Sequence, residues 1–400
     1  MRGAAARLRR TAGWRAVSGL AACVLAVCAT AQALLATPQP VSAPDMPAYE
    51  VSLANLGDRM ALAWYGGGLA RNALWLRFVD ASGRARGGTL QLTSGQRDAF
   101  EPDLQPFGPG LALAWYEKDA GGAMTAWLAC LDGHGQELWR RSLSGIGRNG
   151  RNPLVRVSGQ QLLVAWIETA PGGRPGIWTA RYAASGNPLA AARLAAPAGE
   201  DTWNLNAAVD ASGALYVVYD AALGARAKEL QLLRVAGSHV EHWPLSADDG
   251  SESAYPDIAV EGDRVAIAWL DARDGNPEVY LFVGGLQQLP LRLDMRGTRI
   301  TRTPGVSSGA YLAWNHGRLG LAWSDDIAGT EQVMAQYFAV DGRPLGGATA
   351  LTHGAARSLI PAIRPWRSGF AVAWNDYTPG GGDVTAPAPR TSVAELLLLR

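Results

Sequence analysis

Carboxylate side chains recur at one fixed place in this sequence, two residues after an aromatic residue that returns about every 51 residues. The aromatic positions are Trp64, Trp115, Trp166, Tyr219, Trp269, Trp323 and Trp374. The acidic residues that follow five of them are Glu117, Glu168, Asp271, Asp325 and Asp376. If the fold brings these carboxylates to one face, they form a partial acidic ring that would bind a cationic or polyhydroxyl ligand, or Ca²⁺.

The same regularity also supports a purely structural interpretation of the acids. A carboxylate that keeps the register of the repeat can cap its own turn or pair with a local cation, as Asp271 would with Arg273 two residues later. The acidic ring would then belong to the folding pattern of each repeat. Both interpretations stay open at this stage.

Departures from the repeat provide a second set of candidates, because the fold does not require them. The fourth copy has an insertion at residues 200–204 that contains Trp203, and the sixth is preceded by two arginines. A tryptophan near arginine and tyrosine side chains can stack on a sugar ring. The candidate ligand-binding residues of this set are Trp203, Arg299, Arg302, Tyr311 and His316.

The repeat itself predicts the elements that hold these side chains. Each copy shows a short apolar-alternating segment, a turn, a second segment that ends at the aromatic residue, and two further segments. Four of the seven copies have proline 13 residues before the aromatic, which predicts a first strand opened by proline, where no ladder donor is lost. We place the fourth strands near Leu90–Thr93, Leu194, Leu245, Leu291–Leu293 and Leu351. Four strands per copy predict an all-β, seven-bladed β-propeller with four-stranded antiparallel blades of about 51 residues.

The two ends of the chain are expected to meet. The seventh copy resumes its third strand at residues 393–399 and then lacks a fourth. The proline-rich segment 34–47 precedes the propeller at 48–400 and could supply that strand beside the chain end. A ring closed only by packing between blades is the alternative.

An export signal is predicted at the N-terminus. The first 15 residues contain five arginines and no acid, and an uncharged apolar run follows at residues 16–36. Small residues at Ala31 and Ala33 predict a signal peptide at 1–33, although an uncleaved anchor to residue 36 would also fit. Either form would place the domain in the periplasm or outside the cell. The anchor would be its one membrane contact.

Charge and cysteine content narrow the class of partner. Residues 1–33 hold five of the 36 basic residues and none of the 35 acidic ones, so the remaining chain carries a net charge of −4. It has no basic cluster, which disfavours nucleic acid as a partner. Cys130 is the one cysteine beyond the leader, so no internal disulfide is expected there.

Residues 253–280 resemble the repeat of secreted bacterial β-propellers of the sialidase-like group. The shared pattern is Pro-x-Ile-Ala, then Val-Ala-Trp-x-Asp-x-Arg-x-Gly-Asn, then Val-Tyr, which the fifth copy follows closely. The resemblance implies the fold and little chemistry. Sialidases would also show Asp-boxes, and the nearest string, at residues 246–250, lacks the aromatic residue and lies in the wrong turn.

No spacing in the sequence is diagnostic of catalysis. A sialidase-like site would have to combine Arg299, Arg302, Arg357, Tyr255 and Glu252, and a lyase site His316, Tyr311 and Arg299. The five histidines show no HExxH or comparable metal spacing, so neither a metal nor another cofactor is predicted beyond the Ca²⁺ alternative above.

We therefore expect an exported binding module that recognises a glycan or a protein partner on its funnel face. A carbohydrate-active enzyme, either a glycosidase or a polysaccharide lyase, is the first alternative. A structural scaffold subunit of an envelope complex is the second.

Overall fold

The computed structural model describes residues 38–43, 46–67, 71–290, 293, 296–326, 329–353, 357–377 and 392–399. All of them belong to the compact unit Leu34–Arg400. The predicted signal peptide at 1–33 and the apolar run to residue 36 lie outside the described residues. No helix in the described part of the chain is both long and apolar enough to span a bilayer.

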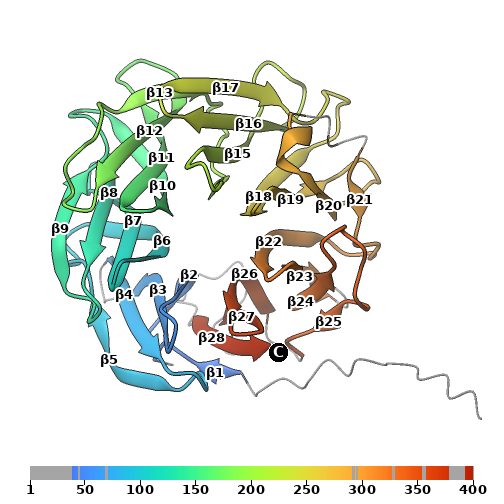
Figure 1. Ribbon diagram of the computed structural model, residues 1–400, viewed down its shortest axis with the longest axis horizontal. Coiled ribbons are helices and arrows are strands. Elements are labelled where there is room, and N and C mark those ends of the chain that lie inside the picture. Colours follow the sequence, from blue (N-terminus) through green and yellow to red (C-terminus); the bar gives the residue numbers. More distant parts are fainter. Residues whose placement is uncertain are drawn as a thin grey trace, which may run out of the picture. The chain divides into compact units, whose positions relative to one another are not determined.

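The described strands form seven four-stranded sheets in which every neighbouring pair is antiparallel, and Figure 1 shows them following one another around a ring. The first strands are β2 (Tyr49–Asn55), β6 (Asp98–Phe107), β10 (Asn149–Ser158), β14 (Leu205–Val209), β18 (Ser253–Glu261), β22 (Ser307–Asn315) and β26 (Arg357–Trp366). The second strands are β3 (Met60–Gly67), β7 (Gly110–Lys118), β11 (Gln161–Thr169), β15 (Leu215–Ala221), β19 (Arg264–Asp271), β23 (Arg318–Asp326) and β27 (Gly369–Tyr377). The predicted all-β propeller with four-stranded antiparallel blades is confirmed.

Two further strands complete each sheet on its outer side. The third strands are β4 (Asn72–Val79), β8 (Met124–Leu131), β12 (Pro175–Ala183), β16 (Glu229–Ala236), β20 (Glu278–Gly285), β24 (Glu331–Phe338) and β28 (Ser392–Leu399). The outer strands are β5 (Ala85–Gln91), β9 (Glu137–Ser142), β13 (Arg193–Pro197), β17 (His239–Pro244), β21 (Thr298–Arg299), β25 (Thr349–Ala350) and β1 (Gln39–Pro40). We refer to the sheets as blades 1 to 7, beginning with the sheet of β2.

The ring is continuous along its inner strands. Each first strand contacts the first strand of the next blade, and β26 contacts β2. The last sheet has the order β1-β28-β27-β26, in which Gln39 pairs with Leu396 and Pro40 with Glu395. The N-terminal segment therefore lies beside the last strand of the chain and supplies the outer strand of blade 7.

The recurring aromatic residue forms the core between blades. All seven of these side chains are at most 2% exposed. Trp115 of blade 2, for example, packs in one cluster with Leu74 and Leu76 of blade 1, and an equivalent cluster fills every other junction between neighbouring sheets. Burying such large rings is favourable by a few kcal/mol each, so the repeat period reports packing between blades.

The prolines of the first strands lie in the strand interior, which corrects the prediction that they open the strand. β6 begins at Asp98, four residues before Pro102, and its pairing with β7 skips between Phe100 and Asp103. The same β-bulge occurs in the first strands of all blades except blade 4. A bulge leaves a backbone donor unpaired, so proline fits there without loss of a ladder bond.

The fourth strand of blade 5 is also elsewhere than predicted. It is β21, which follows a short 3₁₀ helix, η1 (Leu286–Gln288), and a loop. Leu293, which was assigned to the strand, is fully buried in the core between blades 4 and 5, and its backbone N–H donates to the Leu245 carbonyl at 2.7 Å. Its apolar side chain packs in the core between two blades and is not part of a strand.

Removing the β1 segment should weaken the closure of the ring. Val41 is 1% exposed, belongs to the core between blades 7 and 1, and accepts a 2.6 Å hydrogen bond from Arg77 Nη1 through its carbonyl. A chain that begins at residue 43 should lose about 2–4 kcal/mol of unfolding free energy relative to one that begins at residue 38. Equal denaturant midpoints for the two chains would show that β1 contributes nothing.

Candidate functional site

The first strands enclose a central cavity of about 640 Å³. Side chains from all seven blades line it, and its polar and aromatic members come from a few repeated positions on these strands. Large concave cavities with convergent polar groups are the usual place for a ligand. This cavity is the candidate functional site.

One layer of the lining is made by the residue at the bulge of each first strand, just before the position that often holds proline. These residues have φ between 48° and 58° and are Glu50, Glu101, Asn152, Tyr255, Gly309 and Ile360. Such left-handed backbone is unfavourable for residues other than glycine and is often retained where function needs it. Blade 4 lacks the bulge, and Trp203, just ahead of β14, lines the cavity there. We call these seven residues the bulge ring.

Two neighbouring members of the bulge ring are acidic and poorly solvated. Burial raises the pKa of Glu50 to about 7. Burial and the charge of Glu50 raise the pKa of Glu101 well above its usual range, while hydrogen bonds from Asn152 and Tyr116 and the charge of Arg151 partly oppose this. Among the described residues, neither carboxylate has an ion-pair partner within 4.0 Å.

Aromatic rings surround these two carboxylates. The rings of Tyr49, Tyr65, Phe100 and Tyr116 follow one another with centroid distances of 5.4, 5.3 and 5.2 Å. Burial raises the pKa of Tyr65 and of Tyr116. Tyr65 and Tyr116 interact with both carboxylates. Burial is the main physical cause of the raised carboxyl pKa values.

The next two members of the bulge ring are exposed aromatic residues. The exposed fractions of Trp203 and Tyr255 are 44% and 48%, high values for large rings. The guanidinium of Arg151 lies 4.3 Å from the centre of the Trp203 ring, and Asn152 Nδ2 donates to the Trp203 carbonyl at 2.9 Å. Trp203 is thus held at the edge of the cavity by the side chains of blade 3.

Side chains of the preceding blade fix the backbone of the ring at two positions. Asp220 Oδ2 accepts a 2.8 Å hydrogen bond from the Tyr255 N–H, and Asn375 Oδ1 accepts one of 2.8 Å from the Glu50 N–H. Asp220 and Asn375 both directly follow the recurring aromatic residue and are fully buried. They are positioning residues for the ring.

A second layer of charged side chains lies further along the same strands. Arg156 Nη1 contacts Asp103 Oδ2 at 2.7 Å, and Asp257 Oδ2 accepts a 2.7 Å hydrogen bond from the Leu312 N–H. Burial raises the pKa of Asp257 to about 6. Burial and the positive charge of Arg156 lower the pKa of Arg364. In this layer the positive charges of Arg156 and Arg364 balance the negative charges of the two aspartates. The bulge ring, by contrast, contains two acids and no basic residue.

The acids predicted from the repeat are placed outside the cavity lining, next to the recurring tryptophans. Glu117, Glu168, Asp271 and Asp325 are each at most 8% exposed, and each accepts a hydrogen bond of 3.0–3.2 Å from the indole N–H two residues before it. Asp271 also binds Arg273, and Asp376 accepts a 2.9 Å hydrogen bond from Ser358. In this structure each of these acids binds neighbouring side chains.

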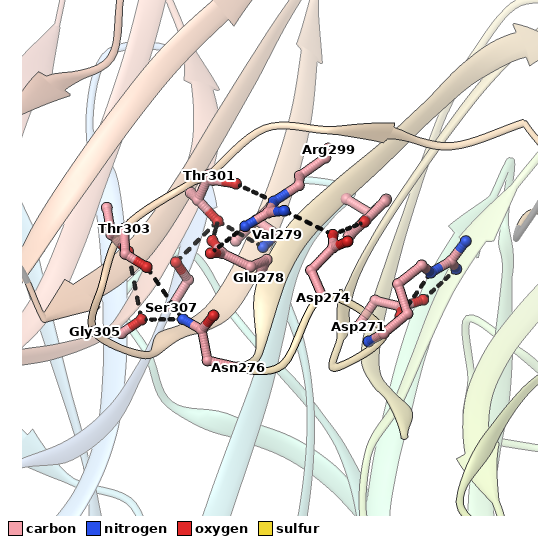
Figure 2. A network of polar contacts seen from close by, with 12 residues as sticks. Asp271, Asp274, Asn276, Glu278, Val279, Arg299, Thr301, Thr303, Gly305 and Ser307 are labelled. Carbon is pink, nitrogen blue, oxygen red and sulfur yellow. Dashed lines mark hydrogen bonds and ion pairs between the residues drawn. The ribbon is translucent and has the colours of Figure 1, made fainter. Parts of the chain in front are cut away.

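The two predicted arginines lie on the outer part of blade 5. Figure 2 shows Arg299 between Glu278 and Asp274, with ion-pair distances of 2.7 and 2.9 Å. Glu278 is fully buried and also accepts a hydrogen bond from Thr301. Arg302 is exposed. Neither arginine lines the cavity.

Tyr311 lies in the middle of β22, and His316 lies just beyond its end. Tyr311 lines the cavity, and burial raises its pKa. His316 lies in the turn between β22 and β23. Among the predicted ligand residues, the cavity therefore brings together only Trp203 and Tyr311 in the described part of the chain.

Sequence reasoning missed Glu50, Glu101 and Asn152 as site residues. A signal was available, because Glu101, Asn152, Tyr255 and Ile360 all directly precede the proline of their copy. Side chains at that register position must face one side of the first strands if the repeat is regular. Within the described residues no group of three or more His, Cys, Asp or Glu side chains could hold a metal ion.

Comparisons with known proteins show which fold the chain has and do not show its function. No family model matches the chain. No curated protein matches it either. Among solved structures, it resembles the β-propeller domain of the Trilobed protease from Pyrococcus furiosus, with a TM-score of 0.51, 11% identity, and coverage of 88% of this chain and 97% of the other.

Two further solved structures act on carbohydrates according to their names. The polysaccharide lyase Uly1 has a TM-score of 0.56 at 9% identity, covering 90% of this chain and 91% of the other. The phage phi92 endosialidase has a TM-score of 0.51 at 8% identity, covering 91% and 69%. At such identities the likeness shows a shared β-propeller fold, and function has to be argued from the cavity.

Proposed function

We propose that this protein is an exported seven-bladed propeller that binds a glycan in its central cavity, with the bulge ring as the recognition surface. The arrangement of the ring is the observation that carries the proposal. Hydrogen-bonding side chains come from blades 1 to 3, exposed aromatic side chains from blades 4 and 5, and Gly309 and Ile360 from blades 6 and 7. Export is supported by the charged and apolar leader of the sequence.

A pyranose has the matching asymmetry. Its edge presents hydroxyl groups, and one of its faces presents C–H groups that pack on an aromatic ring. Trp203 and Tyr255 are exposed and follow one another in the ring, while Glu50, Glu101 and Asn152 provide hydrogen-bonding groups from blades 1 to 3. A ligand that is polar on one side and apolar on the other satisfies this surface better than a uniformly charged or uniformly apolar one.

The test is a glycan screen followed by calorimetric titration of the best ligand. Replacing Trp203 or Tyr255 with alanine should weaken binding about tenfold each, because a stacked ring contributes on the order of 1 kcal/mol beyond its buried area. The control is Leu138→Ala, which removes an apolar side chain that is 62% exposed on the outer strand β9. Unchanged affinity in both aromatic variants would contradict the proposal, and release of shortened glycans would indicate an enzyme instead.

A further inference from the structure

Among the described residues, no cation forms an ion pair with the two carboxylates of the bulge ring, although the charge of Arg151 acts on Glu101 from a greater distance. Asn152 and Tyr116, both neutral donors, hydrogen-bond to the Glu101 carboxylate. For the carboxylate of Glu50, no hydrogen bond or ion pair is found within the described residues. Two ionised acids that interact where burial weakens their hydration repel one another. Protonation relieves this in the protein alone, and a bound positive group would relieve it while both acids stay ionised.

An orphaned acceptor lies next to them. Asn152 lines the same cavity and is 9% exposed. Its Nδ2 donates both to Glu101 and to the Trp203 carbonyl, which fixes the orientation of the amide. Its Oδ1 is buried and has no hydrogen-bond partner among the described residues. A buried acceptor left unpaired is destabilising by about 1–3 kcal/mol, so its retention points to a donor that the described part of the chain does not supply.

The three residues thus present acceptors that require a donor-rich cation. A primary ammonium group carries one positive charge and three N–H donors and has no acceptor. The rings of Tyr65 and Phe100, whose centroids are 5.3 Å apart, border the same carboxylates and provide faces that attract a cation. A divalent metal would need more oxygen ligands than two carboxylates and an amide, and it would have to dehydrate beside these rings.

We propose that the glycan bound by this cavity carries a free primary amine, and that Glu50, Glu101 and Asn152 bind its ammonium group. The inference rests on the proposed glycan function and specifies the substrate class as amino sugars. The sugar ring lies against Trp203 and Tyr255, and the ammonium enters between blades 1, 2 and 3.

The experiment compares a glucosamine trisaccharide with its fully N-acetylated counterpart, titrated into the full chain under identical conditions. The free-amine sugar should bind at least tenfold more tightly, because hydrogen bonds to charged groups contribute more than neutral ones. Glu50→Gln and Glu101→Gln should each remove about tenfold of that affinity and leave the acetylated sugar unaffected. Trp203→Ala should weaken both sugars, and Asp58→Asn, at an aspartate whose side chain is 75% exposed, should change neither.

The binding results distinguish a failure of the ammonium inference from a failure of the glycan function. Equal binding of the two sugars, still sensitive to Trp203→Ala, would overturn the ammonium inference and leave the glycan function standing. Binding of neither sugar, nor of any other glycan in the screen, would overturn the proposed function itself. Tighter binding of a lysine tripeptide with the same dependence on Glu50 would make the ligand a peptide. An increase in melting temperature with Ca²⁺ alone that Glu50→Gln abolishes would make the site a metal site.

Discussion

Replacing Asp271 with alanine should lower the free energy of unfolding by about 3–5 kcal/mol. The carboxylate is 1% exposed and accepts hydrogen bonds from the Trp269 indole at 3.0 Å and from Ser253 at 3.1 Å. It also pairs with the partly buried guanidinium of Arg273. Its removal takes the acceptor away from a buried indole N–H and a hydroxyl and deletes the ion pair with Arg273. Breaking a buried pair on one side has an effect of this size.

Denaturant unfolding of Asp271→Ala and wild type measures the effect. Asp58→Ala is the control, because Asp58 is 75% exposed in its side chain and forms only a surface ion pair with Arg86. Such pairs contribute about 0–1 kcal/mol. The Asp271→Ala, Asp325→Ala double variant should lose still more stability whether or not ligand is present. Normal stability with lost ligand binding would instead support the acidic ring as a binding surface.

The Glu50→Gln, Glu101→Gln double variant should be more stable than wild type above pH 7. Glu50 has a pKa of about 7 in the folded protein, against 4.5 for the free side chain. The folded state therefore binds the proton more tightly than the unfolded state, and stability is lost as pH rises through this window. At about 1.4 kcal/mol per pKa unit, Glu50 alone destabilises the wild type by roughly 3 kcal/mol at pH 8. Glu101 adds an effect in the same direction.

Unfolding free energies measured between pH 4 and pH 8.5 test this prediction. Glu229 and Asp257 also have raised pKa values and will give wild type and variant a common slope, so the difference between the two curves isolates the pair. That difference should be small below pH 4.5 and grow toward pH 8. Glu252→Gln should follow wild type throughout. A difference that shrinks as pH rises would mean that the folded state provides the carboxylates with a cation.

The class of fold could be predicted from the sequence because the requirement behind it is local and repeated. A large aromatic side chain must fill each junction between blades, so Trp115 and its counterparts recur at the length of one blade. The strands that flank it are short and bounded by turns, which excludes helices. Where packing departs from the repeat, the prediction was wrong, as for Leu293, whose apolar side chain fills a junction between blades from a loop.

The candidate site depended on the tertiary structure for two physical reasons. The regular spacing suggested that the acids after each tryptophan form a binding site. In the structure, an acid at that position accepts a hydrogen bond from the indole N–H, as Asp271 does at 3.0 Å. Only the packed sheets show this contact. The bulge that turns Glu50 and Glu101 into one cavity is a backbone feature. The proline that follows it in four copies marks its position in the sequence but does not show that the residue before the proline turns toward the centre. The sequence by itself determined a ring of sheets and the residue that packs them. The tertiary structure decided which side chains face the centre, because residues about 51 positions apart become neighbours only when adjacent blades pack against one another.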